Sequence, residues 1–340
     1  MTGRLTIAQA KKFSQLTHVP FGYLFLDRPP EQEQLPLTDF RTLAHNDPLS
    51  QDFYDVYYDI QRKQVWYRDY LVSVDAEPLS FVGKFNAKHQ LAEEIAEDIR
   101  NTLDIKANLP GRKIKNEDYF SFLTSQAESA GILVFKSGMV GANTHRTLSL
   151  KEFRGFVIID EYAPAVFING KDSHAANTFT LIHEIAHIWR GQSGISDTSA
   201  DTNNAEERLC NAVAAEVLVP KSLFVPEWAK HHGTDQEKIS ALSKSFNVSQ
   251  LVIARRALDA GSIQYSLYKK ISDATYNEHR KKLDSSEGGS PYSVFPVRNS
   301  RKLSRLITDM AVTGSITLKE ASYVLNASPR FIVNYYEQQT

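Results

Sequence analysis

Residues 179–189 read Phe-Thr-Leu-Ile-His-Glu-Ile-Ala-His-Ile-Trp, and this run predicts a buried helix. It is apolar on nearly every side apart from two histidines and one glutamate, as is typical of a helix in a protein core. Because His183 and His187 are four residues apart, a helix projects both imidazoles from one face, about 40° apart around its axis. This H-E-x-x-H spacing places two ring nitrogens on one tetrahedral Zn²⁺, and Glu184 can reach a water molecule beside that ion without being a ligand.

Burial of this helix needs an explanation, because three ionisable side chains without partners would cost several kcal/mol in a core. One interpretation is a helix whose histidines only form hydrogen bonds. We prefer a metal site, because a bound cation removes that cost. We therefore predict His183 and His187 as zinc ligands and Glu184 as the catalytic general base.

A zinc ion of this kind needs a third protein ligand and a position left for water. The helix predicted after residue 205 offers Glu207, and Asn211 shares its face because it lies four residues later. We predict Glu207 as the third metal ligand and Asn211 as a residue that orients one imidazole through its other nitrogen. Glu206 and Glu216 are competing ligands. Their alternative roles are a solvated carboxylate in the first turn and a structural partner of another helix.

The segments before and after residue 205 predict an α+β fold with a small β-sheet, flanked by helical N-terminal and C-terminal segments. A long helix begins at residue 172 or 173 and carries the motif. Short apolar runs typical of buried strands lie at 132–135, 156–159 and 165–168. Helical periodicity upstream lies at 7–16, 43–73, 89–105 and 119–131. The segment 43–73 is unusually aromatic, and we interpret it as a helix face packed on the next domain rather than as a base-stacking or ligand platform.

The chain after residue 221 is predicted to be mostly helical. Residues 238–258 read as two helices joined at 247–249 with Ser249 as N-cap, an arrangement similar to a helix-turn-helix. A linker is predicted at 285–291, which is rich in Ser and Gly. A last helical pair is predicted over 299–338, with Thr317 and Ser328 as N-caps.

Composition excludes several classes of protein. The 340 residues carry 39 basic and 40 acidic side chains, so the strongly basic surface of a dedicated nucleic-acid binder is not expected. The single cysteine, Cys210, cannot form an intrachain disulfide, and we interpret it as a small buried apolar side chain. No apolar stretch of about 18 residues is present, so we expect no membrane association and a cytoplasmic location.

The sequence around the motif resembles the ImmA/IrrE family of metallopeptidases over about residues 80–260. The similarity is carried by 154–156, Pro164, 168–169, 179–189, 193–196 and 211–220. The last of these segments is similar to the family signature Glu-x-x-Ala-Asn-x-Phe-Ala-Ala-Glu-Leu-Leu-Met-Pro, with Cys210 in place of Ala and Val213 in place of Phe. The resemblance implies a gluzincin-like catalytic site with zincin-like helices. It also implies three units: an N-terminal arm over 1–75, a zinc metallopeptidase domain over 76–260 and a helical module over 261–340.

The N-terminal segment 13–41 is similar to the junction that follows a phage-repressor-type helix-turn-helix in longer relatives, so the arm resembles a remnant of that domain. The family resemblance implies a zinc endopeptidase that cleaves a specific protein, such as a helix-turn-helix repressor or antitoxin. The setting would be stress response, phage control or a toxin–antitoxin pair, without direct DNA binding. The alternative is a non-catalytic, protease-like regulator that binds a helix-turn-helix partner or DNA.

Overall fold

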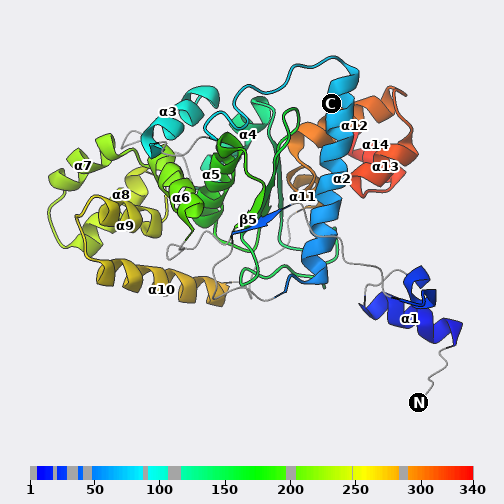
Figure 1. The fold of residues 1–340 in the computed structure, drawn as a ribbon, viewed down its shortest axis with the longest axis horizontal. Coiled ribbons are helices and arrows are strands. Elements are labelled where there is room, and N and C mark those ends of the chain that lie inside the picture. Colours follow the sequence, from blue (N-terminus) through cyan, green and yellow to red (C-terminus); the bar gives the residue numbers. More distant parts are fainter. Residues whose placement is uncertain are drawn as a thin grey trace.

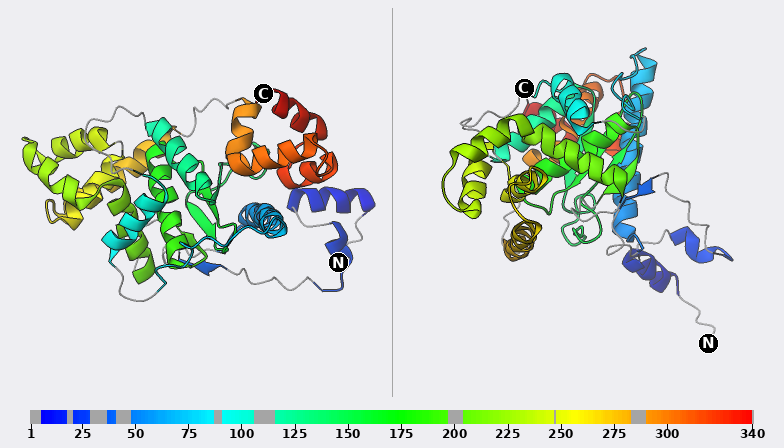
Figure 2. Two further views of the ribbon diagram at one scale, coloured as in Figure 1. Left: turned by 90° about the horizontal axis from the view of Figure 1, so that it is seen from above. Right: turned by 60° about the vertical axis from the view of Figure 1, so that its left-hand side comes forward.

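The computed structural model describes residues 6–17, 21–28, 37–40, 48–86, 91–105, 116–196, 204–246, 248–282 and 290–339. Its α-helices up to residue 190 are α1 (Ile7–Thr17), α2 (Gln51–Ser73), α3 (Ala92–Thr102), α4 (Asn116–Ser129) and α5 (His174–Arg190). Those that follow are α6 (Ala205–Leu218), α7 (Lys221–Lys230), α8 (Asp235–Phe246), α9 (Gln250–Asp259), α10 (Tyr265–Lys282), α11 (Pro291–Arg298), α12 (Arg301–Val312), α13 (Leu318–Leu325) and α14 (Pro329–Glu337). A short 3₁₀ helix, η1 (Phe21–Phe25), follows α1, and α1 stands apart from the rest of the chain (Figures 1 and 2).

A five-stranded mixed sheet lies at the centre of the fold, in the order β1-β5-β3-β4-β2. Its strands are β1 (Thr38–Asp39), β2 (Leu133–Ser137), β3 (Gly155–Ile158), β4 (Ala165–Asn169) and β5 (Gly194–Ser196). β3 is antiparallel to both β4 and β5, whereas β2 runs parallel to β4 and β1 runs parallel to β5. The α+β class is therefore confirmed. The sequence predicted only the three longer strands, because β1 and β5 are too short to show a period of two.

Both faces of this sheet are buried, which divides the core into two layers. Along β4, Val166 and Ile168 face one layer while Ala165 and Phe167 face the other, as alternation along a strand requires. Helices α3, α4, α5, α6, α8 and α9 build the first layer (Figure 1). The second layer comes from α2 and α11–α14, which lie on the opposite side of the sheet when it is seen from above (Figure 2).

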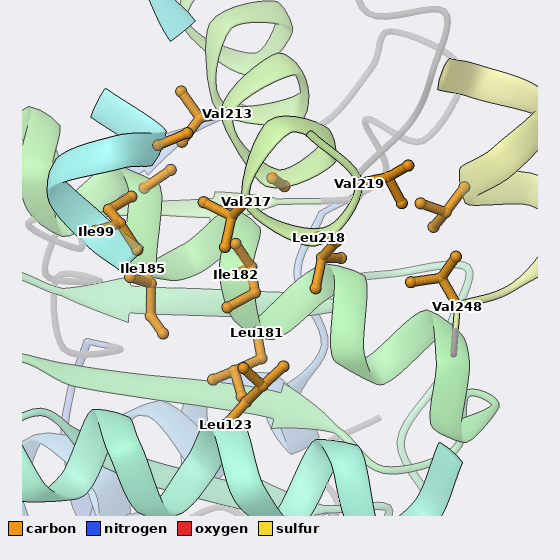
Figure 3. Close-up of a cluster of buried hydrophobic side chains, with 14 of the residues drawn as sticks. Ile99, Leu123, Leu181, Ile182, Ile185, Val213, Val217, Leu218, Val219 and Val248 are labelled. Carbon is orange, nitrogen blue, oxygen red and sulfur yellow. The ribbon is translucent and has the colours of Figure 1, made fainter. Parts of the chain in front are cut away.

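Helix α5 is the central helix of the first layer. Ser173 caps its N-terminus by accepting a hydrogen bond from the amide of Ala176, and Gly191 ends it in the left-handed region at φ 67°. Its apolar face packs against α4 and α6, where Leu181, Ile182 and Ile185 lie among the side chains that Figure 3 labels. The predicted helix start at residue 172 or 173 is thus confirmed to within one or two residues.

Helix α2 explains the aromatic segment predicted at 43–73. The helix begins at Gln51 rather than at residue 43, because Ser50 caps it by accepting a hydrogen bond from the amide of Phe53. Phe53, Tyr57 and Tyr67 are buried in the second layer of the core. The interpretation as a packing face is therefore confirmed.

The C-terminal region corrects one prediction. The last helical pair expected over 299–338 is in fact three helices, α12 to α14, because Thr313 ends α12 and Gly314 follows at φ 81°. Thr317, Ser328 and Ser249 are N-caps as predicted. Of the predicted linker, residues 285–289 lie outside the described residues.

Among the described residues, no single helix is long and apolar enough to cross a membrane. In the same part of the chain, one bent pair of helices, α6 and α7, which meet at 62°, is long and apolar enough when the two are taken together.

Candidate metal centre

Three predicted ligand residues meet at one point between α5 and α6. His187 Nε2 lies 3.0 Å from Glu207 Oε1, and His183 Nε2 lies 3.2 Å from Glu207 Oε2. The two Nε2 atoms are 3.2 Å apart. All three side chains are fully buried. The chain thus brings two ring nitrogens and both oxygens of one carboxylate together in its interior.

Packing between the two helices sets this geometry. α6 lies along α5 in the first core layer, where Val213, Val217 and Leu218 contribute apolar side chains (Figure 3). Asn204 caps α6 by accepting a hydrogen bond from the amide of Glu206, so the helix begins at Ala205, two residues before Glu207. Because α6 starts there, its first turn presents Glu207 to the two histidines of α5.

The spacing of these atoms fits a divalent cation. Ligands held at roughly 2.0–2.2 Å in a tetrahedral arrangement lie about 3.3–3.6 Å from one another, close to the separations observed here. Two imidazoles and a carboxylate are also the donor set that three-ligand zinc sites use. Among the described residues, His183, His187 and Glu207 could therefore hold the ion, and His187, Glu206 and Cys210 form a second group of possible ligands that shares one histidine with the first.

The two buried carboxyl groups of the site, Glu184 and Glu207, have pKa values shifted in opposite directions. Burial opposes ionisation of Glu207, but the imidazoles of His183 and His187 outweigh it and lower the pKa of Glu207 to about 2. Burial raises the pKa of Glu184 to about 8, and the charge of Glu207 adds to the rise. Burial also opposes a charge on either imidazole. Glu207 overcomes this at His183, whose pKa is raised, but not at His187, whose pKa is lowered.

The residues around the ligands take distinct positions. Asn211 lies beside His183, close enough for its side chain to raise the pKa of that imidazole. Glu206, one of the competing ligands, pairs with Arg190, whose Nε lies 2.6 Å from Glu206 Oε1, and its carboxylate also lies near His187 and Cys210. Cys210 Sγ lies 3.6 Å from His187 Nδ1, so it contacts the ring nitrogen opposite to the one that faces Glu207.

Glu216, the other competing ligand, lies away from the three predicted ligands. Its Oε2 forms an ion pair at 2.9 Å with Arg256 Nη2, and both side chains are buried. The carboxylate also accepts a hydrogen bond from the amide of Lys221. Glu216 therefore joins α6 to α9 and to the start of α7, which is the structural role that the sequence left open.

The sequence did not identify the residues that hold Glu184. A Cβ atom on Gly155 would lie 2.7 Å from Glu184 Oε1, so the absence of a side chain at this position makes room for the carboxylate. Ser196 is fully buried on β5, and its hydroxyl lies 3.5 Å from Glu207 Oε1 and lowers the pKa of Glu184. Both residues lie in segments quoted for the family resemblance, but neither has a side-chain pattern that indicates a role in catalysis.

Phe40 is a second neighbour that the sequence did not reveal. It follows β1, and its ring stacks on the imidazole of His187 with centroids 5.1 Å apart and planes 8° from parallel. Only 5% of the Phe40 side chain is exposed. A residue 147 positions before His187 in the chain thus covers one face of a predicted metal ligand.

A hydrogen bond beside the site holds α3 against α5. The indole Nε1 of Trp189 donates to Asp98 Oδ1 over 2.9 Å, and the ammonium group of Lys84 also contacts this carboxylate. Burial opposes ionisation of Asp98, but these hydrogen bonds outweigh it and hold the pKa of Asp98 below its usual value. This contact fixes the C-terminal turn of α5 two residues after His187.

Comparison with known proteins gives one match. Residues 127–258 match a peptidase family model described as the IrrE N-terminal-like domain. The matched segment contains both helices that carry the predicted ligands, α5 and α6. It also contains every strand of the sheet except β1. No curated protein and no solved structure matches the chain.

Proposed function

Residues 127–258 belong to the ImmA/IrrE family of metallopeptidases, and from this premise we propose that the chain is a zinc-dependent endopeptidase that cleaves a specific protein. The observation that carries the proposal is the convergence of His183, His187 and Glu207 within hydrogen-bond distance of one another, in a fully buried site. A cation held by these residues supplies Lewis-acid chemistry: it polarises carbonyl oxygens and acidifies water.

Glu184 is the proton carrier of the proposed reaction. Its carboxylate takes a proton from the attacking water and delivers it to the nitrogen of the leaving amine as the peptide bond breaks. Burial raises the pKa of Glu184, which favours the protonated form that exists between these two steps, whereas the positive charge of a bound cation would favour the carboxylate that takes the proton first. Glu207, with its pKa lowered, stays ionised between the imidazoles.

Asn211 is the proposed orienting residue of the site. Its position beside His183 supports this role, because a partner on the second ring nitrogen fixes the tautomer of an imidazole ligand. The surrounding apolar residues of α5 and α6 exclude bulk water, which strengthens the electrostatic contacts between the four charged or titratable groups.

We further propose that the substrate is a transcriptional regulator, a helix-turn-helix repressor or antitoxin, in stress response, phage control or a toxin–antitoxin module. The support for this part is the family resemblance of the sequence. The near balance of 39 basic and 40 acidic residues supports a protein substrate rather than direct binding of DNA.

The metal part of this proposal is tested by the zinc content of the purified chain. We expect one zinc per wild-type chain and per Glu184→Gln chain, and a loss of zinc in His183→Ala. His174→Ala is the matched control, because this histidine is itself exposed and lies in the first turn of the same helix. Retention of a full equivalent of zinc by His183→Ala would contradict the ligand assignment.

The substrate part is tested by affinity capture from cells. The Glu184→Gln variant keeps the ligands but lacks the proton carrier, so it should retain an intact protein that the wild type shortens. The captured protein is identified by mass spectrometry and then offered to both purified forms. A captured protein that the wild type leaves uncut in the presence of zinc would show that the chain binds without cleaving.

A further inference from the structure

Strand β1 lies on the sheet edge nearest to the predicted ligands. It pairs in parallel with β5, where the amide of Thr38 donates to the carbonyl of Ser193 and the amide of Phe40 donates to that of Ile195, both at 3.1 Å. β5 also carries Ser196, whose hydroxyl lies beside Glu207. Without β1, therefore, β5 would present unpaired backbone groups directly beside the catalytic residues.

The side chain of Phe40 fills a slot between β5 and His187. A Cβ atom on Gly194 would lie 2.1 Å from the Phe40 ring and 3.0 Å from the carbonyl oxygen of Thr38. The three atoms nearest to such a Cβ thus all belong to the segment 38–40. The absence of a side chain at Gly194 makes room for this segment. The imidazole of His187 stacks on the Phe40 ring and forms another side of the slot.

The segment 38–40 therefore has the features of a bound peptide rather than of a core strand. It contributes a single aromatic anchor, while the side chains of Thr38 and Asp39 are exposed. Its affinity for the sheet comes from main-chain hydrogen bonds and from one side-chain slot, which is how extended peptides bind to sheet edges. A polypeptide substrate can reach Glu184 and the ligands along β5 only if this edge is free.

We propose that residues 38–40 are an intramolecular inhibitor, with Phe40 closing the catalytic site until an extended peptide bearing a large apolar side chain displaces it from β5. The catalytic consequence rests on the proposed function, whereas the shielding of His187 does not. Because the bound and displaced forms are in equilibrium, the fraction of open sites limits both ligand exchange and substrate binding.

Shielding is tested on the metal-free protein by the rate at which diethyl pyrocarbonate modifies His187, followed by mass spectrometry. Phe40→Ala removes the ring, and Gly194→Ala expels the segment without changing a residue of the catalytic site. We expect both variants to raise the modification rate of His187 about tenfold or more. The exposed His174 serves as the internal reference, and its rate should stay constant.

Phe25→Ala is the matched control, because it deletes the same side chain at a position of the N-terminal region where 67% of the residue is exposed. It should leave His187 as slow as in the wild type. A normal far-ultraviolet circular dichroism spectrum and melting temperature for Gly194→Ala would show that faster modification does not come from unfolding. Wild-type modification rates in both Phe40→Ala and Gly194→Ala would overturn the proposal.

The zinc-loaded protein provides the second measurement. A small chelator should withdraw zinc from Phe40→Ala and Gly194→Ala about tenfold faster than from the wild type or Phe25→Ala, with the same zinc stoichiometry in all four. Equal withdrawal rates would refute the shielding. A chain that binds no zinc at all would instead refute the proposed function, and the modification rates of His187 would still decide whether Phe40 shields the site.

Discussion

The Gly155→Ala variant tests whether the position of Glu184 limits the reaction. Gly155 lies at the start of β3, and its φ is not in the left-handed region, so alanine is sterically allowed by the backbone. The added Cβ would lie 2.7 Å from Glu184 Oε1 and 3.0 Å from both the Phe167 carbonyl oxygen and Thr180 Cγ2. The strand carbonyl cannot yield as easily as a side chain, so the carboxylate of Glu184 must move.

The size of the effect follows from these distances. Ordinary contacts of a Cβ begin at 3.4 Å, so the carboxylate oxygen must retreat by about 0.7 Å. Overpacking of a dense core costs roughly 1–3 kcal/mol of unfolding free energy. Misplacement of a catalytic group by about 1 Å lowers the rate on the order of 100-fold, so we expect kcat to fall by about 30- to 100-fold. None of the predicted ligands is among the three nearest neighbours of the new Cβ, so zinc content should not change.

The assay combines kcat on a peptide that the wild type cleaves, zinc content and urea unfolding. Gly138→Ala is the matched control, because the three atoms nearest to its Cβ all belong to the flexible side chain of Lys171, at 3.2 Å or more. This control should keep wild-type kcat and lose little stability. The reasoning fails if Gly155→Ala is destabilised as expected yet retains wild-type kcat, because the position of Glu184 would then not limit the rate.

Three further substitutions test the framework around the site. Ser300→Ala should lower the unfolding free energy by about 1–3 kcal/mol in urea titrations, because the buried Glu128 loses a hydroxyl donor at 2.6 Å; an unchanged midpoint would contradict this. Glu216→Gln should cost about 3 kcal/mol in the same titrations without loss of zinc, because it leaves Arg256 as an uncompensated buried charge; zinc loss would restore Glu216 as a ligand. Asp98→Asn should lower the melting temperature at pH 7 but progressively less as the pH falls below about 4. The pKa of this carboxyl group is lower in the folded than in the unfolded protein, so its contribution to stability is present above the unfolded pKa and is lost on acidification. A difference in melting temperature between Asp98→Asn and the wild type that does not change with pH would argue against the ion pair.

The sequence predicted those elements in which a local pattern and the tertiary structure agree. The apolar run at 179–189 predicted α5 because burial on every side is visible in the residues themselves. The N-caps Ser249, Thr317 and Ser328 were predictable because a short hydroxyl side chain before an apolar period satisfies a free amide locally. His183 and His187 could be proposed as a ligand pair for a similar reason, since their helical spacing is a local property.

What the sequence could not predict depends on contacts between distant segments. β1 and β5 have two and three residues, so neither contains enough positions to show alternation. Their pairing is a tertiary contact between residues more than 150 positions apart. The sequence next to Phe40 and Gly155 does not mark either residue, and each gains its proposed role from a predicted site residue that the fold brings to it, His187 for Phe40 and Glu184 for Gly155.

The strand order supports the proposal that a substrate would reach the site along β5. Helices cover both faces of the sheet, so a polypeptide can reach the backbone of the sheet only at an edge. At one edge, α4 and α11 pack against β2, and β3 and β4 separate that edge from β5. At the other edge β5 lies beside Glu207 through Ser196, and the only described strand beyond it is the two-residue β1. A short, exposed strand held by few hydrogen bonds opens at lower free energy than a core strand. The edge that lies closest to the predicted ligands is therefore also the edge that this fold can open most easily.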